Sequence, residues 1–160
     1  MKTRHTARAV MLDPQDRVLL FEFQLPEGTI AGGPSRFWAT PGGAIEPDED
    51  VRAALEREVR EETGFAEFDI GPELWVGEHT LTFNGVATFS RERFFVVRVS
   101  TAAINRDGWT ELEREVMRDH RWWSVDELLS THETIFPANF GQLVRRFLRE
   151  GTNGVARIEL

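Results

Sequence analysis

Apolar residues in the first part of the chain are concentrated in short runs that turn-forming residues separate. Residues 7–12 (ARAVML) and 17–23 (RVLLFEF) are strand-like, and the Asp-Pro-Gln-Asp sequence between them predicts a turn. We therefore expect these two runs to form a hairpin. Residues 24–36 contain several Gly and Pro residues and predict a surface loop. The following FWATPGGA predicts a short strand that enters a glycine turn.

A helix is expected over residues 50–64. Asp50 has the short acceptor side chain that is typical of a helix N-cap, and Gly64 suits the left-handed conformation that often ends a helix. Apolar residues recur at every fourth position and would form one stripe facing the core: Val51, Leu55 and Val59.

The second half of the chain alternates strand and helix signals. Residues 73–83 and 86–99 have the pattern of two strands joined by Asn84-Gly85, a dipeptide that favours a type I′ hairpin turn. Both faces of the second strand carry apolar residues, so we expect it to be buried on both sides. The other expected elements are a polar loop with a short helical piece (101–115), a strand (120–123), a short helix capped by Ser124, and an amphipathic helix (138–150).

This order of strands, helix, strands and helix predicts an α/β (α+β) fold in which a mixed sheet is flanked by helices. The chain has 160 residues and shows no repeat and no internal linker, so we expect a single domain over 1–160. Residues 151–160 are expected to be a mobile, Gly-rich tail, or to pair through ARIEL with the sheet edge of a second copy. The protein is accordingly expected to be a monomer or a homodimer.

Composition narrows the functional classes. The formal net charge of −8 argues against a protein that binds nucleic acid polymers, because such proteins are typically basic. The absence of Cys excludes a disulfide framework and a Cys-based zinc site, and it is consistent with a reducing compartment. No apolar run approaches 18 residues and the N-terminal sequence lacks the pattern of a signal peptide. We therefore expect no membrane association and a cytoplasmic location.

Three carboxylates gather on one side of the last two turns of the expected helix. Glu58, Glu61 and Glu62 stand at positions i, i+3 and i+4, where like charges repel, and they lie at the negative end of the helix dipole. Such an arrangement destabilises the free helix, but it is explained if a bound cation neutralises it. Carboxylate oxygens without neighbouring His or Cys favour Mg²⁺, with Mn²⁺ as the alternative.

Two features next to these carboxylates fit a metal site. Arg57 lies four residues before Glu61 and could hold its carboxylate in place. Gly42 and Gly43 allow a sharp backbone turn that could bring a main-chain carbonyl to the same metal.

Residues 43–65 resemble the Nudix box, G-x5-E-x7-R-E-U-x-E-E-x-G-U, in which U is a bulky apolar residue. Gly43 is followed after five residues by Glu49, and seven more residues lead to the segment REVREETGF, which begins at Arg57. Every specified position matches. The resemblance implies a Nudix-like α-β-α sandwich and a metal-dependent pyrophosphohydrolase, which cleaves the diphosphate of a nucleoside diphosphate linked to another moiety X.

The resemblance also implies roles for individual residues. Glu58, Glu61 and Glu62 would be the metal ligands, and Glu58 is also a candidate for the base that activates water. The other implied roles are orientation of a box glutamate by Arg57, bracing of the loop–helix junction by Glu49, helix termination at Gly64, and a metal-binding carbonyl at Gly42 or Gly43.

The base and the substrate contacts stay open at this point. In some Nudix enzymes a glutamate from a later loop is the base, and here the candidates are Glu111, Glu113 and Glu115. The candidates for substrate contact are Trp38, Trp122 and Glu115, although core packing explains the tryptophans equally well.

The nature of X also stays open. The compact chain favours a nucleoside triphosphate or related nucleotide, with a dinucleoside polyphosphate or a nucleotide sugar as alternatives. A non-catalytic nucleotide-sensing module of the same fold is a further alternative. Such modules typically lose box carboxylates, and all of them are present here.

Overall fold

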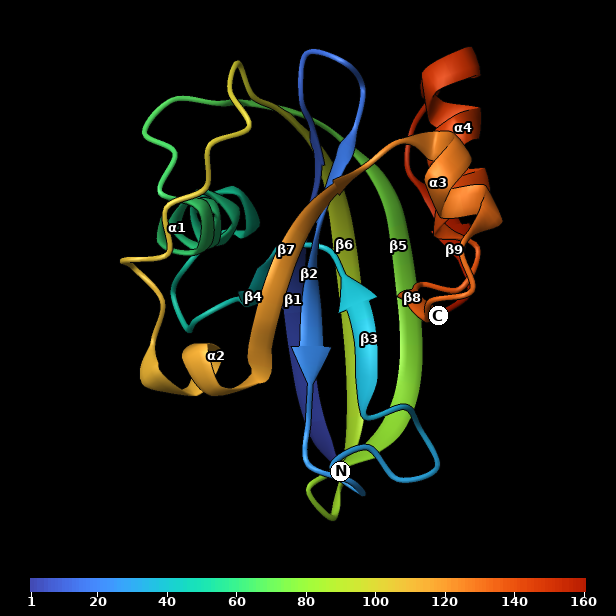
Figure 1. The fold of residues 1–160 in the computed structure, drawn as a ribbon. Coiled ribbons are helices and arrows are strands. Elements are labelled where there is room, and N and C mark those ends of the chain that lie inside the picture. Colours follow the sequence, from blue (N-terminus) through green and yellow to red (C-terminus); the bar gives the residue numbers. More distant parts are fainter.

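The computed structural model describes all 160 residues, and its centre is a nine-stranded mixed sheet (Figure 1). The strands are β1 (Lys2–Leu12), β2 (Val18–Gln24), β3 (Arg36–Ala39), β4 (Gly42–Ala44), β5 (Asp69–Phe83), β6 (Val86–Arg98), β7 (Met117–Trp123), β8 (Ile135–Phe136) and β9 (Ala156–Ile158). The helices are α1 (Val51–Thr63), α2 (Glu111–Val116), α3 (Val125–Ser130) and α4 (Phe140–Glu150). The main strand order is β8-β3-β2-β1-β6-β5-β9, while β4 pairs with β1 and β7 pairs with β2.

Each face of the sheet carries its own apolar layer, as alternation along the strands requires. On β1, Ala7, Ala9 and Met11 join the layer that contains the apolar side chains of α1. Val10 and Leu12 point to the opposite face and join the layer that contains residues of α3 and α4. Figure 1 shows α1 on one side of the sheet and α3 with α4 on the other. The predicted mixed sheet with flanking helices is therefore confirmed.

The local signals for helix α1 are confirmed in detail. The Asp50 side chain accepts a hydrogen bond of 2.8 Å from the Ala53 amide, which satisfies one of the free N–H groups at the helix start. Gly64 has φ = +76° and its N–H donates to Arg60 O at 3.0 Å, so it ends the helix in the left-handed conformation.

The predicted hairpins also form. β1 and β2 are antiparallel, and β5 and β6 are joined through Asn84 and Gly85, whose φ values of +49° and +78° are those of a type I′ turn. β5 begins at Asp69, four residues earlier than expected. Gly71-Pro72 does not end the strand because the register shifts between Ile70 and Glu73 accommodate it as a bulge.

Two short strands were not anticipated. β8 pairs in parallel with β3, and β9 pairs in parallel with β5 of the same chain. In addition, Leu160 packs against Gly77, where a β-carbon would lie 2.5 Å from the Leu160 side chain. Residues 156–158 of the tail therefore pair with β5 within the same chain. None of the four helices combines the length and apolarity that spanning a membrane requires.

Strand β1 pairs with β2 at one end and with β4 nearer the other, and this pairing positions the glycine turn. The end of β1 at Leu12 pairs with β2, whereas Thr6, Ala7 and Arg8 pair with β4. Strand β4 lies directly before the loop that enters α1 and contacts that helix. The C-terminal half of α1 consequently faces the backbone of the glycine turn.

Candidate functional site

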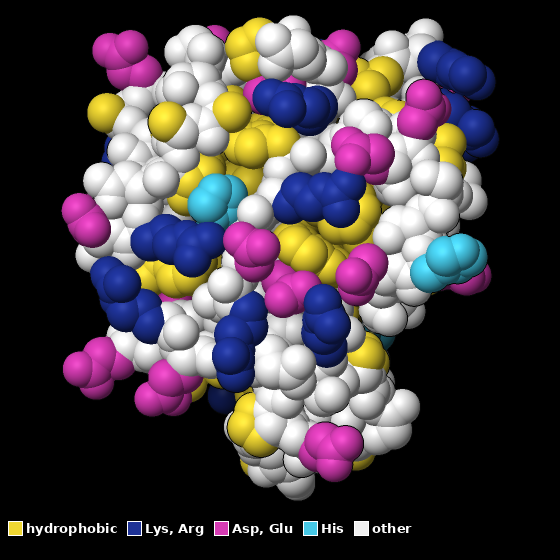
Figure 2. Space-filling view, viewed as in Figure 1, with side chains coloured by type: hydrophobic (Ala, Val, Ile, Leu, Met, Phe, Trp, Pro, Cys, Tyr) yellow, Lys and Arg dark blue, Asp and Glu magenta, His cyan; other side chains and the backbone are white.

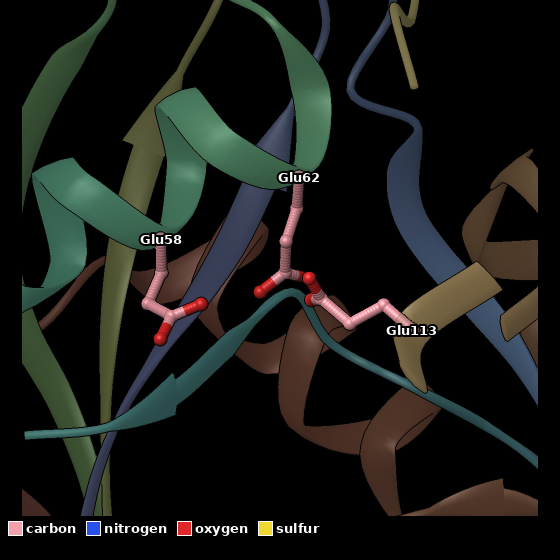
Figure 3. A group of neighbouring side chains, drawn as sticks. All are labelled: Glu58, Glu62 and Glu113. Carbon is pink, nitrogen blue, oxygen red and sulfur yellow. The ribbon is translucent and has the colours of Figure 1, made fainter. Parts of the chain in front are cut away.

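Three carboxylates converge between α1 and α2. Oxygen atoms of Glu58 and Glu62 on α1 and of Glu113 on α2 all lie within 4.8 Å of one another. Figure 3 shows the three side chains pointing toward a common space from the two helices. The structure thus selects Glu113 from the three later glutamates and brings it to the box, whereas Glu111 and Glu115 are exposed on the same short helix.

Glu62 is the most enclosed of these carboxylates, with only 2% of the residue exposed. It accepts one hydrogen bond of 3.2 Å from the Gly42 amide. Burial raises the pKa of Glu62 well above its ordinary value, and Glu58 and then Glu113 raise it further. A buried carboxylate beside two others is unfavourable unless a cation balances it. The donor set consists of hard oxygens, so the residues present fit a divalent metal such as Mg²⁺.

Glu61 is not part of this group of three. Its side chain is 44% exposed, and its nearest basic atom is Arg57 Nη1 at 3.6 Å. Partial desolvation, followed by repulsion from Glu58, raises the pKa of Glu61. Glu61 therefore lies at the edge of the cluster, where a second cation could reach it, and its place among the ligands stays a prediction.

Arg57 has a different main partner from the one expected. Its guanidinium forms a two-point ion pair with Glu49, at 2.8 and 2.9 Å, and this pair lowers the pKa of Glu49 to about 2. The same guanidinium donates to Glu58 Oε1 at 3.0 Å and to Ala44 O at 3.1 Å. Arg57 therefore ties the loop before α1 to the helix and orients Glu58, while its contact with Glu61, at 3.6 Å, is longer than those with Glu49 and Glu58.

The glycine turn leaves room for the carboxylates. Gly42 has φ = +137°, and a β-carbon there would lie 2.1 Å from Ala7 O, so no other residue fits. A β-carbon at Gly43 would lie only 2.5 Å from Glu58 Oε1. The Gly42 carbonyl accepts a long hydrogen bond of 3.4 Å from Arg8 Nη1. The turn is thus in direct contact with Glu58 and Glu62, as a shared site requires.

The segment before α2 is anchored on the C-terminal end of α1. Trp109 is buried and its Nε1–H donates to Glu62 O at 2.7 Å, and the Asn105 amide donates to Thr63 O at 2.8 Å. These bonds satisfy carbonyls that the helix end leaves free. At Gly108 a β-carbon would lie 2.6 Å from Glu61 O, so the backbone approaches closely there.

Glu113 is held by a capping box at the start of α2. The Thr110 amide donates to Glu113 Oε1 at 2.9 Å, and the Glu113 amide donates to Thr110 Oγ1 at 3.1 Å. The Thr-x-x-Glu pattern was therefore the signal that could have singled out Glu113, because it fixes that side chain at a helix N-terminus while its neighbours remain exposed.

The candidate substrate residues do not belong to the group of three carboxylates. Trp38 is 5% exposed and packs edge-on against Trp123 in the apolar layer on the α3–α4 side of the sheet. Trp122 is half-buried on the α1 side and donates to Ala102 O at 3.0 Å. Glu115 is exposed. Both tryptophans therefore have packing roles in this structure, and their contact with substrate stays a prediction.

Comparison with known proteins agrees with this geometry. Residues 2–147 match the NUDIX domain. No curated protein matches the chain significantly in sequence. The MutT protein from Methanosarcina mazei Go1 is 21% identical, with a TM-score of 0.64 and coverage of 95% of this chain and 97% of that one.

Two further solved structures share the fold. A UDP-X diphosphatase is 17% identical (TM-score 0.63, covering 97% of this chain and 67% of that one). An Ap4A hydrolase from C. elegans is 16% identical (TM-score 0.54, covering 90% and 96%). The domain match extends over most of the chain and includes the glycine turn, the capped helix and the converging carboxylates, and on this basis the chain belongs to the Nudix family.

Proposed function

We propose that this Nudix pyrophosphohydrolase cleaves a nucleoside diphosphate linked to a further moiety, using a divalent cation held by Glu58, Glu62 and Glu113, with Glu61 at the edge of the site. The observation that carries the proposal is the convergence of three carboxylates within 4.8 Å, one of them almost completely buried. Mg²⁺ is the proposed ion, with Mn²⁺ as the alternative, because the available donors are carboxylate and backbone oxygens.

The residues of the site have two roles, which are to bind and orient the reacting groups and to accept a proton. A bound divalent cation would neutralise charge on the diphosphate and lower the pKa of a bound water. Arg57 keeps Glu58 oriented through its 3.0 Å bond while its ion pair with Glu49 holds the loop. In the overall reaction a water oxygen bonds to phosphorus, the bridging P–O bond breaks, and a carboxylate accepts the proton of the water.

Two carboxylates can accept that proton. Glu58 is held by Arg57, and Glu113 is held by the Thr110 amide, so each has one oxygen already engaged. Both belong to the cluster, and both are partly exposed. The pH–rate profiles of Glu58→Gln and Glu113→Gln identify which carboxylate is the base. Loss of the base removes the rising limb of the profile, whereas loss of a metal ligand alone raises the metal concentration needed for activity.

A nucleoside triphosphate is the proposed substrate class. Two structural relatives are named for different substrates, a UDP-X diphosphatase and an Ap4A hydrolase, and each is less than 25% identical, so the relatives support the fold alone. The preference for triphosphates rests on the compact chain. A non-catalytic sensing role is disfavoured because every carboxylate of the box is present.

The test is hydrolysis of a panel of nucleoside triphosphates, dinucleoside polyphosphates and nucleotide sugars with Mg²⁺, Mn²⁺ or EDTA. Wild-type protein is expected to release product only with metal, and Glu62→Gln is expected to lose at least about 100-fold in kcat, since a charged ligand is removed from the reacting centre. Glu56→Gln, on an exposed part of the same helix, is the matched control. Hydrolysis that is unaffected by EDTA, or Glu62→Gln with full activity, would refute the proposal.

The pH dependence is a second readout. Because the pKa values of Glu61 and Glu62 are raised, metal binding and hydrolysis are expected to increase as pH rises toward alkaline values, where these groups are ionised. An optimum below about pH 6 would contradict this reasoning.

A further inference from the structure

The short helix α2, which carries Glu113, has little packing of its own. It has six residues, none of them buried, and a helix of that length is marginal without outside contacts. Its C-terminal end continues directly into β7, where Met117 is buried in the apolar layer on the α1 side. Its N-terminal end, where the capping box holds Glu113, is preceded by residues 99–110, which form no helix or strand. The position of Glu113 therefore depends on what holds that preceding segment.

Arg106 connects the segment to the sheet. Its Nη2 donates to Asp119 Oδ1 at 3.3 Å and lies 2.7 Å from His120 Nδ1, and both partners belong to β7. Strand pairing fixes β7 itself, because His120 lies opposite Phe21 of β2. An arginine has only N–H donors, so Nδ1 of His120 must accept and carries no proton. Burial and then Arg106 lower the pKa of His120, although Asp119 raises it, which keeps the ring neutral at neutral pH.

The same arginine contacts Trp109 and α2. Its guanidinium carbon lies 5.0 Å from the centre of the Trp109 ring, which is a cation–π contact. Its carbonyl accepts hydrogen bonds from the Trp109 amide at 3.1 Å and from Arg114 Nη2 at 2.9 Å. Trp109 in turn donates to Glu62 O, and Arg114 directly follows Glu113 on α2. Arg106 thus joins β7 to the end of α1 and to the helix that carries Glu113.

The exposure of Arg106 separates a positioning role from a packing role. Figure 2 shows basic side chains on the surface over α2 and β7, and 37% of the Arg106 side chain is exposed. An exposed ion pair such as that with Asp119 contributes little to stability, because both charges stay largely hydrated. Loss of the Arg106 side chain should therefore leave the fold intact and change mainly the position of α2.

We propose that Arg106 is a positioning residue for hydrolysis, which keeps Glu113 of α2 in place against Glu58 and Glu62 of α1. The inference rests on the proposed function and deepens it, because it assigns a residue outside the Nudix box to the geometry of the metal site. Arg106 forms its ion pair with Asp119 rather than with a carboxylate of the site, so it acts through the segment that it holds. Removing a partner that positions a metal ligand typically costs about 10–100-fold in metal affinity or activity.

The test is the Mg²⁺ affinity of Arg106→Met, measured by titration calorimetry. The substitution removes the charge and the donors but keeps an unbranched side chain, and Mg²⁺ binding is expected to weaken about tenfold. Arg98→Met is the matched control, because Arg98 is also an exposed arginine that pairs with one carboxylate, at 3.4 Å, and its Mg²⁺ affinity is expected to equal that of wild-type protein. A double-mutant cycle tests whether Arg106 acts through Glu113. Adding Arg106→Met to Glu113→Gln should then weaken Mg²⁺ binding by less than about twofold.

His120 provides a second pair of variants. The side-chain oxygen of Asn lies the same number of bonds from the backbone as Nδ1 of His, so His120→Asn retains an acceptor for Arg106 whereas His120→Leu removes it. His120→Leu is expected to weaken Mg²⁺ binding several-fold. His120→Asn is expected to keep the affinity within about twofold of wild type.

Three results would overturn the inference. These are an unchanged Mg²⁺ affinity in Arg106→Met, an equal loss in Arg98→Met, and a loss from Arg106→Met that is as large in Glu113→Gln protein as in wild type, which would indicate a general structural effect. Folding is checked by circular dichroism, and if Arg106→Met does not fold, equal affinities of His120→Asn and His120→Leu overturn the inference instead. Failure of the proposed function is distinguishable, because wild-type protein would then hydrolyse no substrate of the panel while Arg106→Met still weakened Mg²⁺ binding.

Discussion

Replacing Glu62 by Gln is expected to stabilise the metal-free protein while abolishing its response to metal. The Glu62 carboxylate is buried beside Glu58 and Glu113 and receives only the Gly42 amide as donor. A Gln side chain has nearly the same shape and retains an oxygen for the Gly42 amide, but it carries no charge. The substitution therefore isolates the free-energy penalty of the negative charge.

The magnitude follows from two independent limits. Two unit charges at 4.8 Å, the largest separation within the cluster, repel by about 3.5 kcal/mol at an effective dielectric constant of about 20. Protonation sets an upper limit on the free-energy penalty of the buried charge. Binding a proton at pH 7.5 to a carboxyl with an ordinary pKa of 4.5 costs about 4 kcal/mol, so a larger penalty would be relieved by protonation. The lost attraction to Arg8 offsets part of the gain. We expect Glu62→Gln to raise the free energy of unfolding by about 2–3 kcal/mol, or Tm by roughly 5–10 °C.

The raised pKa of Glu62 determines how the stability gained by Glu62→Gln depends on pH. Because the pKa of Glu62 is higher in the folded than in the unfolded protein, the folded state binds more protons, and stability falls as pH rises above the unfolded value of 4.5. The gain from Glu62→Gln should therefore be present at pH 7.5 in EDTA and absent at pH 4. The assay is thermal unfolding followed by circular dichroism at both pH values, with and without Mg²⁺.

Glu56→Gln is the control, since Glu56 lies on the exposed side of the same helix, where it pairs only with Arg60 at 3.4 Å. Saturating Mg²⁺ should stabilise wild-type protein, by about 2.7 kcal/mol at a hundredfold excess over Kd, and should stabilise Glu62→Gln little. Equal Tm values at pH 7.5 in EDTA, or a gain that persists at pH 4, would show that the buried charge is not the source of the effect.

Three further outcomes are expected. Gly43→Ala places a methyl group against the Glu58 carboxylate, so kcat should fall at least about tenfold and the Mg²⁺ concentration for half-maximal rate should rise; an unchanged metal titration would contradict this contact. Trp109→Phe removes the Nε1–H bond to Glu62 O and should lower the free energy of unfolding by about 1–3 kcal/mol, measured by urea unfolding; a loss below about 0.5 kcal/mol would mean that the bond does not hold the segment. Glu113→Gln should weaken Mg²⁺ binding in calorimetry at least about tenfold whereas Glu111→Gln should not, and equal affinities would remove Glu113 from the site.

Local sequence sufficed for the parts of the fold whose geometry depends on near neighbours. The helix between Asp50 and Gly64 was predicted because a cap, an apolar repeat and a terminating glycine act within a few residues. The Asn84-Gly85 turn was predicted for the same reason. The spacing of the glutamates on α1 likewise determined that they share one side, since the helical period is constant.

Local patterns could not decide which distant groups meet. Arg57 pairs mainly with Glu49, eight residues away, rather than with the helical neighbour that its spacing suggested, because the loop before α1 folds back against the helix. Trp38 is close to the glycine turn in sequence but lies in the apolar layer on the other side of the sheet. A strand reverses side-chain direction at each residue, so proximity along the chain does not predict the face.

By itself the sequence determined the family, the helix that carries the acids and the class of bond that the enzyme acts on, because these depend on residue identity at short, regular spacings. Only the tertiary structure brought Glu113 to Glu58 and Glu62, through bonds from Trp109 and Asn105 to the end of α1. These juxtapositions join residues tens of positions apart. Their energies arise from packing and hydrogen bonding between elements, which no local pattern encodes.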